Sequence, residues 1–255
     1  MTSTTTENGR LGNQIFRNIA VSMIAKQHNL KVDYANYQKI SEQLGIPLFS
    51  GNNVYTDYVL LDDDNFFEVL SYPTRYFAYN LYADKAFFQT KDISQTIYKY
   101  LRHSPTKTQI IQHNPYSERY GRNQDIYIHI RLTDLIEYTP GYEYFANLIR
   151  KIPHDQLYIS TDEETHAIIT QLKQSFPYMI VLRMDEIETI QFASTCKHVI
   201  LSHSTFSAII GYIAYYSTVY YPSYQPGKVW CGDIFRIFGW ISIPNNIPAH
   251  TSNVS

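Results

Sequence analysis

Residues 125–134, DIYIHIRLTD, are the clearest indication of the fold that we expect for this chain. Its first half alternates isoleucine with tyrosine and histidine, and a run of β-branched and aromatic residues is typical of a buried strand. Polar residues follow at once, and a helical pattern then begins in YEYFANLIRKI, residues 142–152. A strand, a polar loop and a helix in this order predict the first unit of a parallel α/β sheet.

The same order repeats as far as residue 222. We predict further strands at residues 156–160, 178–182, 198–202 and 218–222, and helices at residues 162–176, 187–195 and 204–217. Parallel strands that are joined by such helices form a doubly wound sheet. The second half of the chain is therefore predicted to be an α/β domain with a parallel sheet.

The first half of the chain is less regular. We predict a helix, a strand and a helix at residues 14–29, 31–35 and 37–45, and then a strand, an irregular aromatic-rich segment and a helix at residues 57–64, 71–82 and 92–103. The opening MTSTTTE reads as a short disordered leader. The expected organisation is an N-terminal α/β domain over residues 1–115, a second α/β domain over residues 116–235 and a C-terminal tail over residues 236–255.

Composition excludes several classes of protein. The net charge of −2 provides no field that would attract nucleic acid or an anionic membrane. Residues 198–227 carry no charged side chain, yet serine and threonine interrupt them, so we expect no membrane span. Two cysteines are too few for a disulfide scaffold or a four-cysteine zinc site. The opening segment has neither an apolar stretch nor a basic start, so we expect no secretory signal and a cytoplasmic location.

Polar clusters follow three of the predicted strands. They are HIRLTD at residues 129–134, STDEE at residues 160–164 and SHSTFS at residues 202–207. Doubly wound sheets bind their ligands at the carboxyl ends of the strands. Since arginine, aspartate, serine and threonine are suited to holding a phosphorylated nucleotide, the clusters predict a nucleotide site.

Each residue in these clusters also has a purely structural interpretation. Arg131 offers a rigid fork of donors to phosphate oxygens, or it forms a surface ion pair with Asp134 or Glu137. Ser204 and Thr205 open a helix, where hydroxyls and free N–H groups hold an anion or simply cap the helix.

Two further residues and one turn carry the same ambiguity. Asp162 either caps a helix or binds a ribose or a base, and His129 is either a satisfied core histidine or a general base. The turn NGRLGNQIFRN, residues 8–18, is either an ordinary cap or a place where an anion approaches a helix N-terminus. A GxGxxG fingerprint after a strand, a phosphate loop, a GxSxG elbow and an HExxH motif are all missing from the sequence.

Four motifs together resemble a known family. The segments GRLGNQIF, HIRLTD, YISTDEE and LSHSTFSAIIGYIA begin at residues 9, 129, 158 and 201. In this order they resemble the motifs of α-1,2-fucosyltransferases of glycosyltransferase family 11. HIRLTD is also similar to the HxRRTD form of α-1,6-fucosyltransferases, and the first motif to that of protein O-fucosyltransferases. The resemblance spans residues 9 to 222.

The resemblance implies two Rossmann-like halves that face a cleft, the GT-B arrangement, and an inverting transferase without metal or cofactor. Its donor would be a GDP-sugar, usually GDP-fucose, and its acceptor a hydroxyl of a glycan. The N-terminal domain would lie on the acceptor side, and the second domain would bind the nucleotide sugar. Nucleic acid and a membrane are not expected partners.

The family's site residues carry over to matching positions. Arg131 matches the arginine that holds the β-phosphate, and Asp134 is a conceivable base, as is Asp33. The remaining expected donor-binding residues are Arg10, Gly12, Asn13 and Gln14 of the first motif, His129, Ser160, Asp162, and Ser204, Thr205 and Phe206 of the last motif.

The sequence also departs from the family. Leu132 replaces a second arginine, and Thr133 replaces the glycine of family 11. These departures leave two alternatives open. One is a transferase for another nucleotide sugar, such as GDP-rhamnose, GDP-mannose or a UDP-sugar. The other is a nucleotide- or glycan-binding protein without catalysis. The acceptor, the linkage and the oligomeric state stay open as well.

Overall fold

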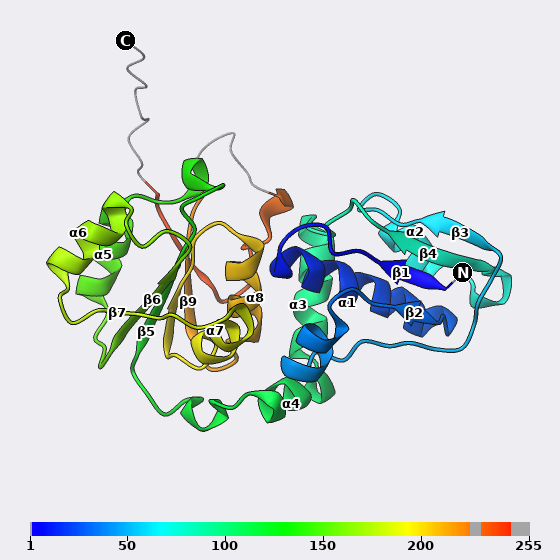
Figure 1. The fold of residues 1–255 in the computed structure, drawn as a ribbon, viewed down its shortest axis with the longest axis horizontal. Coiled ribbons are helices and arrows are strands. Elements are labelled where there is room, and N and C mark those ends of the chain that lie inside the picture. Colours follow the sequence, from blue (N-terminus) through cyan, green and yellow to red (C-terminus); the bar gives the residue numbers. More distant parts are fainter. Residues whose placement is uncertain (1, 225–230, 246–255) are drawn as a thin grey trace, which may run out of the picture. The chain divides into compact units, whose positions relative to one another are not determined.

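The computed structural model describes residues 2–224 and 231–245. These residues divide into two compact units, one of residues 2–117 with 231–237 and one of residues 118–224 with 238–245. Each unit is built on a sheet whose strand pairs are all parallel, as Figure 1 shows. The predicted α/β class, with a doubly wound parallel sheet in the second half, is confirmed.

The sheet of the second unit has six strands in the order β10-β9-β8-β5-β6-β7. Their bounds are β5 (Ile126–Ile130), β6 (Leu157–Thr161), β7 (Ile180–Val181), β8 (His198–Ile200), β9 (Thr218–Pro222) and β10 (Ile241–Ile243). Strand β5 is central and is buried at every position. The chain adds β6 and β7 on one side of β5 and then β8, β9 and β10 on the other. The order therefore reverses between β5 and β8, where such sheets place their ligands.

Helices cover both faces of this sheet (Figure 1). Helices α5 (Tyr142–Lys151) and α6 (Ala167–Ser175) lie on one face, and α7 (Glu186–Ala193) and α8 (Thr205–Ile213) lie on the other. The core under α5 and α6 is formed by fully buried side chains such as Ile128, Phe145 and Leu172. Burial on both faces explains why β5 has no exposed polar residue at alternate positions: the tyrosine and the histidine between its isoleucines are buried as well.

The first unit has four strands in the order β2-β1-β4-β3. The strands are β1 (Ser3–Thr5), β2 (Val32–Asp33), β3 (Asp57–Leu60) and β4 (Tyr79–Ala83). The helices are α1 (Leu11–His28), the π-helix η1 (Gln38–Gln43), α2 (Phe66–Ser71), α3 (Lys91–Arg102) and α4 (Ser104–His113). The described parts of both units also contain the short 3-10 turns η2 (Thr74–Tyr76), η3 (Ser117–Arg119), η4 (Ile136–Tyr138) and η5 (Cys231–Asp233).

The prediction of a disordered leader was wrong. Strand β1 lies between β2 and β4, and the side chains of Ser3 and Thr5 are buried. The hydroxyl of Ser3 accepts a hydrogen bond from the backbone of Leu81, and that of Thr5 accepts one from Ala35. A strand of serine and threonine carries no hydrophobic pattern. Its polar side chains are buried because neighbouring backbone groups bond to them.

Other elements also differ from the sequence-based expectation, among them helices α2 and α4, which were not predicted. The aromatic-rich segment contains β4, and residues 238–245, inside the expected tail, add β10 to the second sheet. Helix α6 begins at Ala167 instead of residue 162, with the ring of His166 accepting a bond from Ile168 N. Asp162 does not start this helix because its carboxylate bonds elsewhere, as described below.

Within the described ranges, the search for a membrane span found no helix of sufficient length and apolarity. Cys196 is buried and free.

Candidate functional site

The centre of the candidate site is the guanidinium of Arg131, directly after β5. Its Nε donates to Asp134 Oδ1 at 2.7 Å, and its Nη1 lies 3.0 Å from Asp162 Oδ2. The Arg131 side chain is 12% exposed, Asp162 is 19% exposed and Asp134 is 56% exposed. Two carboxylates from different segments therefore hold one partly buried cation in a single orientation. The surface ion pair considered from the sequence exists, but it forms half of this clamp.

Asp162 shapes the loop that carries Arg131. Its Oδ1 accepts the backbone N–H of Leu132 at 2.8 Å, and its Oδ2 accepts the hydroxyl of Thr133 at 2.5 Å. Asp162 follows β6, and β6 pairs directly with β5. Adjacent strands of a parallel sheet end side by side, so the carboxylate reaches across to the neighbouring loop. This is a third role for Asp162, beside the cap and the nucleoside ligand that the sequence suggested.

The N-terminus of α8 follows β8 on the other side of β5. Ser204 is its N-cap, and the Ser204 hydroxyl accepts the N–H of Ser207 at 3.0 Å. In the part of the chain that the structure covers, no acceptor bonds to the N–H of Phe206. The first turn of a helix directs such N–H groups outward and carries a partial positive charge. Thr205 also lies in this turn and is buried.

A chain of hydrogen bonds joins these two strand ends. The N–H of Arg131 donates to Ser202 Oγ at 3.2 Å, Ser202 Oγ lies 3.4 Å from Ser207 Oγ, and Ser207 Oγ lies 2.6 Å from Nδ1 of His129. Burial lowers the pKa of His129 to about 4, although the nearby Asp162 opposes the shift. The ring is therefore neutral at pH 7 and suits a structural role more than that of a general base. Phe206 packs against it with ring centroids 5.1 Å apart.

Ser160 takes part in the interior of the sheet. It is buried, and its hydroxyl bonds to that of Tyr127 on the paired strand. The Ser160 hydroxyl is thus bonded to a side chain of the neighbouring strand.

The turn in front of α1 belongs to the first unit. Gly9 has φ +81°, and a Cβ at this position would lie 2.6 Å from Asn13 Nδ2 and 2.9 Å from Phe87. Glycine is needed there both for its left-handed backbone and for close packing. Arg17, fully buried, donates from Nη1 to the carbonyls of Thr6 and Asn8.

The predicted ligands of this turn bond mostly within the unit. Asn13 Oδ1 accepts a bond from Gln89, and Gln14 Nε2 donates to the carbonyls of Glu7 and Gly9. Gln14 and Gly12 are buried, whereas Arg10 is exposed at the N-cap of α1. Asn13 and Gln14 therefore hold the turn in shape, and Arg10 is the member whose side chain reaches solvent.

Several residues around Arg131 and in the turn before α1 were not singled out from the sequence. Ser202 and Ser207 lie inside the quoted hydroxyl-rich cluster, and the density of hydroxyls there was the available signal. Thr139 bonds through its hydroxyl to the carbonyl of Arg131, and nothing in its local sequence marks it. Arg17 also gave no signal, because a charged residue inside a helix is usually exposed.

Among residues 2–224 and 231–245, no group of three or more His, Cys, Asp and Glu side chains is placed to hold a metal ion.

No protein-family model and no curated protein matches the sequence. Solved structures with a related arrangement include the E. coli heptosyltransferase WaaC with ADP-2-deoxy-2-fluoro heptose. That likeness has 12% identity and a TM-score of 0.49, and it covers 95% of this chain and 93% of the other. POFUT1 in complex with GDP-fucose is similar at 12% identity and a TM-score of 0.47, over 96% of this chain and 98% of that one.

Proposed function

We propose that the protein is a glycosyltransferase and that its second unit binds the diphosphate of a nucleotide sugar between the ends of β5 and β8. The observation that carries this proposal is the clamped guanidinium of Arg131 at the reversal point of the sheet. The four sequence motifs, which resemble those of fucosyltransferases, favour GDP-fucose as the donor and a glycan hydroxyl as the acceptor.

The clamp leaves one edge of Arg131 for a ligand. Nε and Nη1 are engaged by Asp134 and Asp162, whereas Nη2 has no acceptor within the described residues. A guanidinium whose orientation is already fixed loses little entropy when it binds a phosphate oxygen. Two carboxylates around one cation give the clamp a net negative charge, so an incoming anion needs further donors.

The N-terminus of α8 supplies such donors. Its first turn offers outward N–H groups and the positive end of the helix dipole, and it has no acidic side chain. The hydrogen bond from Arg131 N to Ser202 fixes the spacing between the two strand ends. We expect the β-phosphate to contact Arg131 and the N–H of Phe206.

The reaction that suits this site is a displacement at the anomeric carbon. The bond from that carbon to the β-phosphate oxygen breaks, and a bond to the acceptor oxygen forms on the opposite face. Negative charge grows on the leaving diphosphate, where Arg131 and α8 stabilise it without a metal. Asp134 is half exposed beside Arg131 and is our candidate to accept the proton of the acceptor hydroxyl.

Calorimetry of Arg131 variants tests the proposal. Arg131→Ala should weaken GDP binding by about 1.5–3 kcal/mol, the worth of a charged hydrogen bond, and should lower turnover further. Arg131→Lys should restore only part, because an ammonium lacks the planar fork. Arg183→Ala is the matched control, since Arg183 forms an ion pair in the same unit but is 80% exposed.

The choice of nucleotide separates the alternatives. Binding of GDP, UDP and ADP to the wild type identifies the donor class, and binding without turnover of any donor identifies a non-catalytic protein. If a folded Arg131→Ala variant bound every nucleotide as the wild type does, the site would be misassigned.

A further inference from the structure

His203 has an arrangement that the proposed binding of a nucleotide does not use. It lies directly before the N-cap of α8, and its side chain is buried. Nδ1 lies 3.1 Å from the carbonyl oxygen of Tyr138, and Nε2 lies 2.8 Å from that of Pro222. The ring of Tyr224 stacks on the imidazole with centroids 4.4 Å apart.

Both partners of the ring nitrogens are acceptors only. A neutral imidazole has one N–H and one lone pair, so it donates to one carbonyl and turns a lone pair toward the other. The imidazolium has two N–H groups and donates to both. Both carbonyl oxygens therefore receive a hydrogen bond from His203 only when the ring carries a proton on each nitrogen.

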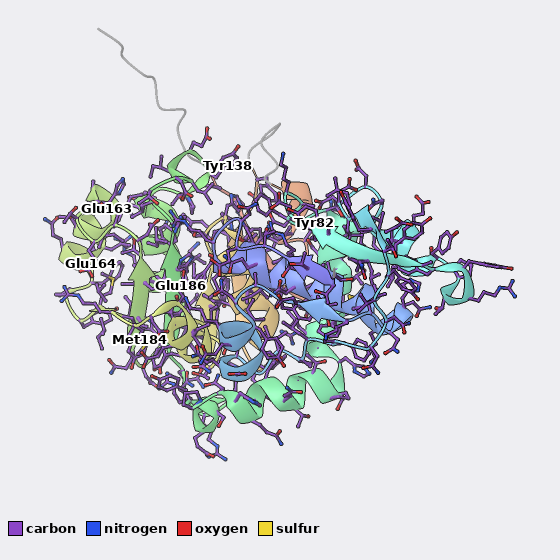
Figure 2. All side chains as sticks on the ribbon, turned by 45° about the vertical axis from the view of Figure 1, so that its right-hand side comes forward. Tyr82, Tyr138, Glu163, Glu164, Met184 and Glu186 are labelled. Carbon is purple, nitrogen blue, oxygen red and sulfur yellow. The ribbon has the colours of Figure 1, made fainter. Side chains whose placement is uncertain are left out.

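The two carbonyls belong to different elements. Tyr138, labelled in Figure 2, ends η4 in the loop after β5, and Pro222 ends β9. In that loop the hydroxyl of Thr139 bonds to the carbonyls of Arg131 and Leu135. Two donated bonds from His203 would therefore tie the loop that carries Arg131 to the far side of β8.

The surroundings set the charge of the ring. Burial lowers the pKa of His203, and the two carbonyls raise it by a smaller amount. The loop after β5 contributes Arg131, Asp134, Glu137 and the phenol of Tyr138.

Strand β9 and its extension contribute the phenols of Tyr220, Tyr221 and Tyr224. The charged and titratable side chains of α5 are Glu143, Arg150, Lys151, Tyr142 and the buried Tyr144, whose hydroxyl donates to the carbonyl of Leu201, two residues before His203. The first turn of α8 holds no acid. An anion bound at the first turn of α8, directly after His203, would stabilise an imidazolium at this position.

We propose that His203 is a positioning residue that takes up a proton when a diphosphate binds beside it, and that its imidazolium then holds the Arg131 loop in place. This inference rests on the proposed function. Because residue 132 is leucine, Arg131 is the one arginine in the loop after β5. A protonated His203 would supply a second cation near the diphosphate.

Nitrogen-15 NMR of the histidine rings tests the inference directly. The wild type, labelled at histidine, is titrated between pH 5.5 and 8.5 without and with GDP, and His203→Gln assigns the ring signals. If that variant does not fold, contacts to the Tyr224 ring assign them in the wild type. With GDP, the two nitrogens of His203 should converge on the imidazolium shift, and the midpoint should rise by about one pH unit.

Proton linkage gives a second readout. Across the interval between the two midpoints, GDP affinity should fall about tenfold with rising pH, beyond the change from the phosphate itself. His203→Gln should remove this component, and His154→Gln should keep it. His154 is the matched control because its ring bonds to the carbonyl of Ile152 and the hydroxyl of Tyr178, outside the site.

The outcomes separate the two proposals. GDP binding with an unchanged, neutral His203 would overturn the inference and leave the proposed function standing. Failure of the wild type to bind GDP or any other nucleoside diphosphate would overturn both. An equal pH dependence of affinity in the wild type and in a folded His203→Gln variant would also overturn the inference.

Discussion

Replacing Asp162 by asparagine separates positioning from simple charge neutralisation. The amide oxygen of asparagine still accepts the N–H of Leu132, which now bonds to Oδ1. The amide nitrogen takes the place of Oδ2 and faces the Nη1 of Arg131, so the ion pair is lost and two donors oppose each other. The change is thus confined to one side of the carboxylate and preserves its shape.

The expected cost follows from the burial of the pair. Removing one partner of a buried ion pair costs about 3–5 kcal/mol, whereas an exposed pair contributes less than about 1 kcal/mol. With side chains 12% and 19% exposed, the pair lies between these limits. We expect the free energy of unfolding to fall by about 2 kcal/mol in urea denaturation. For a chain of this size the melting temperature should fall by about 4–8 °C.

The sign of the effect on ligand binding is the sharper test. Asp162→Asn removes a negative charge from an anion site, so neutralisation alone would tighten GDP binding. If Asp162 positions Arg131 and its loop, binding should weaken instead, by about three- to tenfold.

Glu164→Gln is the matched control. Glu164 lies in the same strand-end segment and pairs with the exposed Arg183, so its replacement should change stability by less than about 1 kcal/mol. Tighter GDP binding by Asp162→Asn, or unchanged stability, would refute the positioning role.

Three further predictions concern stability. Gly9→Ala should lower the free energy of unfolding by about 1–3 kcal/mol more than Gly121→Ala, as measured by urea denaturation of both variants. Both glycines have a left-handed φ, but only a Cβ at Gly9 would meet other atoms, the nearest 2.6 Å away. Gly211→Ala should destabilise by a similar amount, since its Cβ would lie 2.5 Å from the Trp240 ring, and Trp240→Ala in the same chain should relieve part of the loss. The pKa of His129 is about 4 in the folded state and about 6.5 in the unfolded state, so between these values the unfolded state binds one more proton. The free energy of unfolding should therefore fall by up to about 3 kcal/mol as the pH drops from 6.5 to 4, and this fall should be missing in His129→Gln.

Local sequence patterns were sufficient to predict the architecture of the second unit. Each of its strands from β5 to β9 is a run of apolar, β-branched or aromatic residues followed by a helical pattern, and both signals are local. The parallel order then places residues such as Arg131 and Ser204 at the same edge of the sheet, because all strands point the same way. The candidate site was therefore predictable as a set of strand ends.

Tertiary structure alone decided which atoms meet there. Strand β1 and the residues of β10 have weak local patterns and are ordered by pairing with strands distant in the sequence. Asp162 could have capped α6, yet its carboxylate bonds to the loop after β5, which lies close only once β5 and β6 have paired. The ring nitrogens of His203 likewise contact the carbonyl oxygens of Tyr138 and Pro222, which belong to other elements. These contacts form because the sheet brings distant chain segments within hydrogen-bond distance. Hydrophobic periodicity reports only local structure, so it does not predict which segments meet.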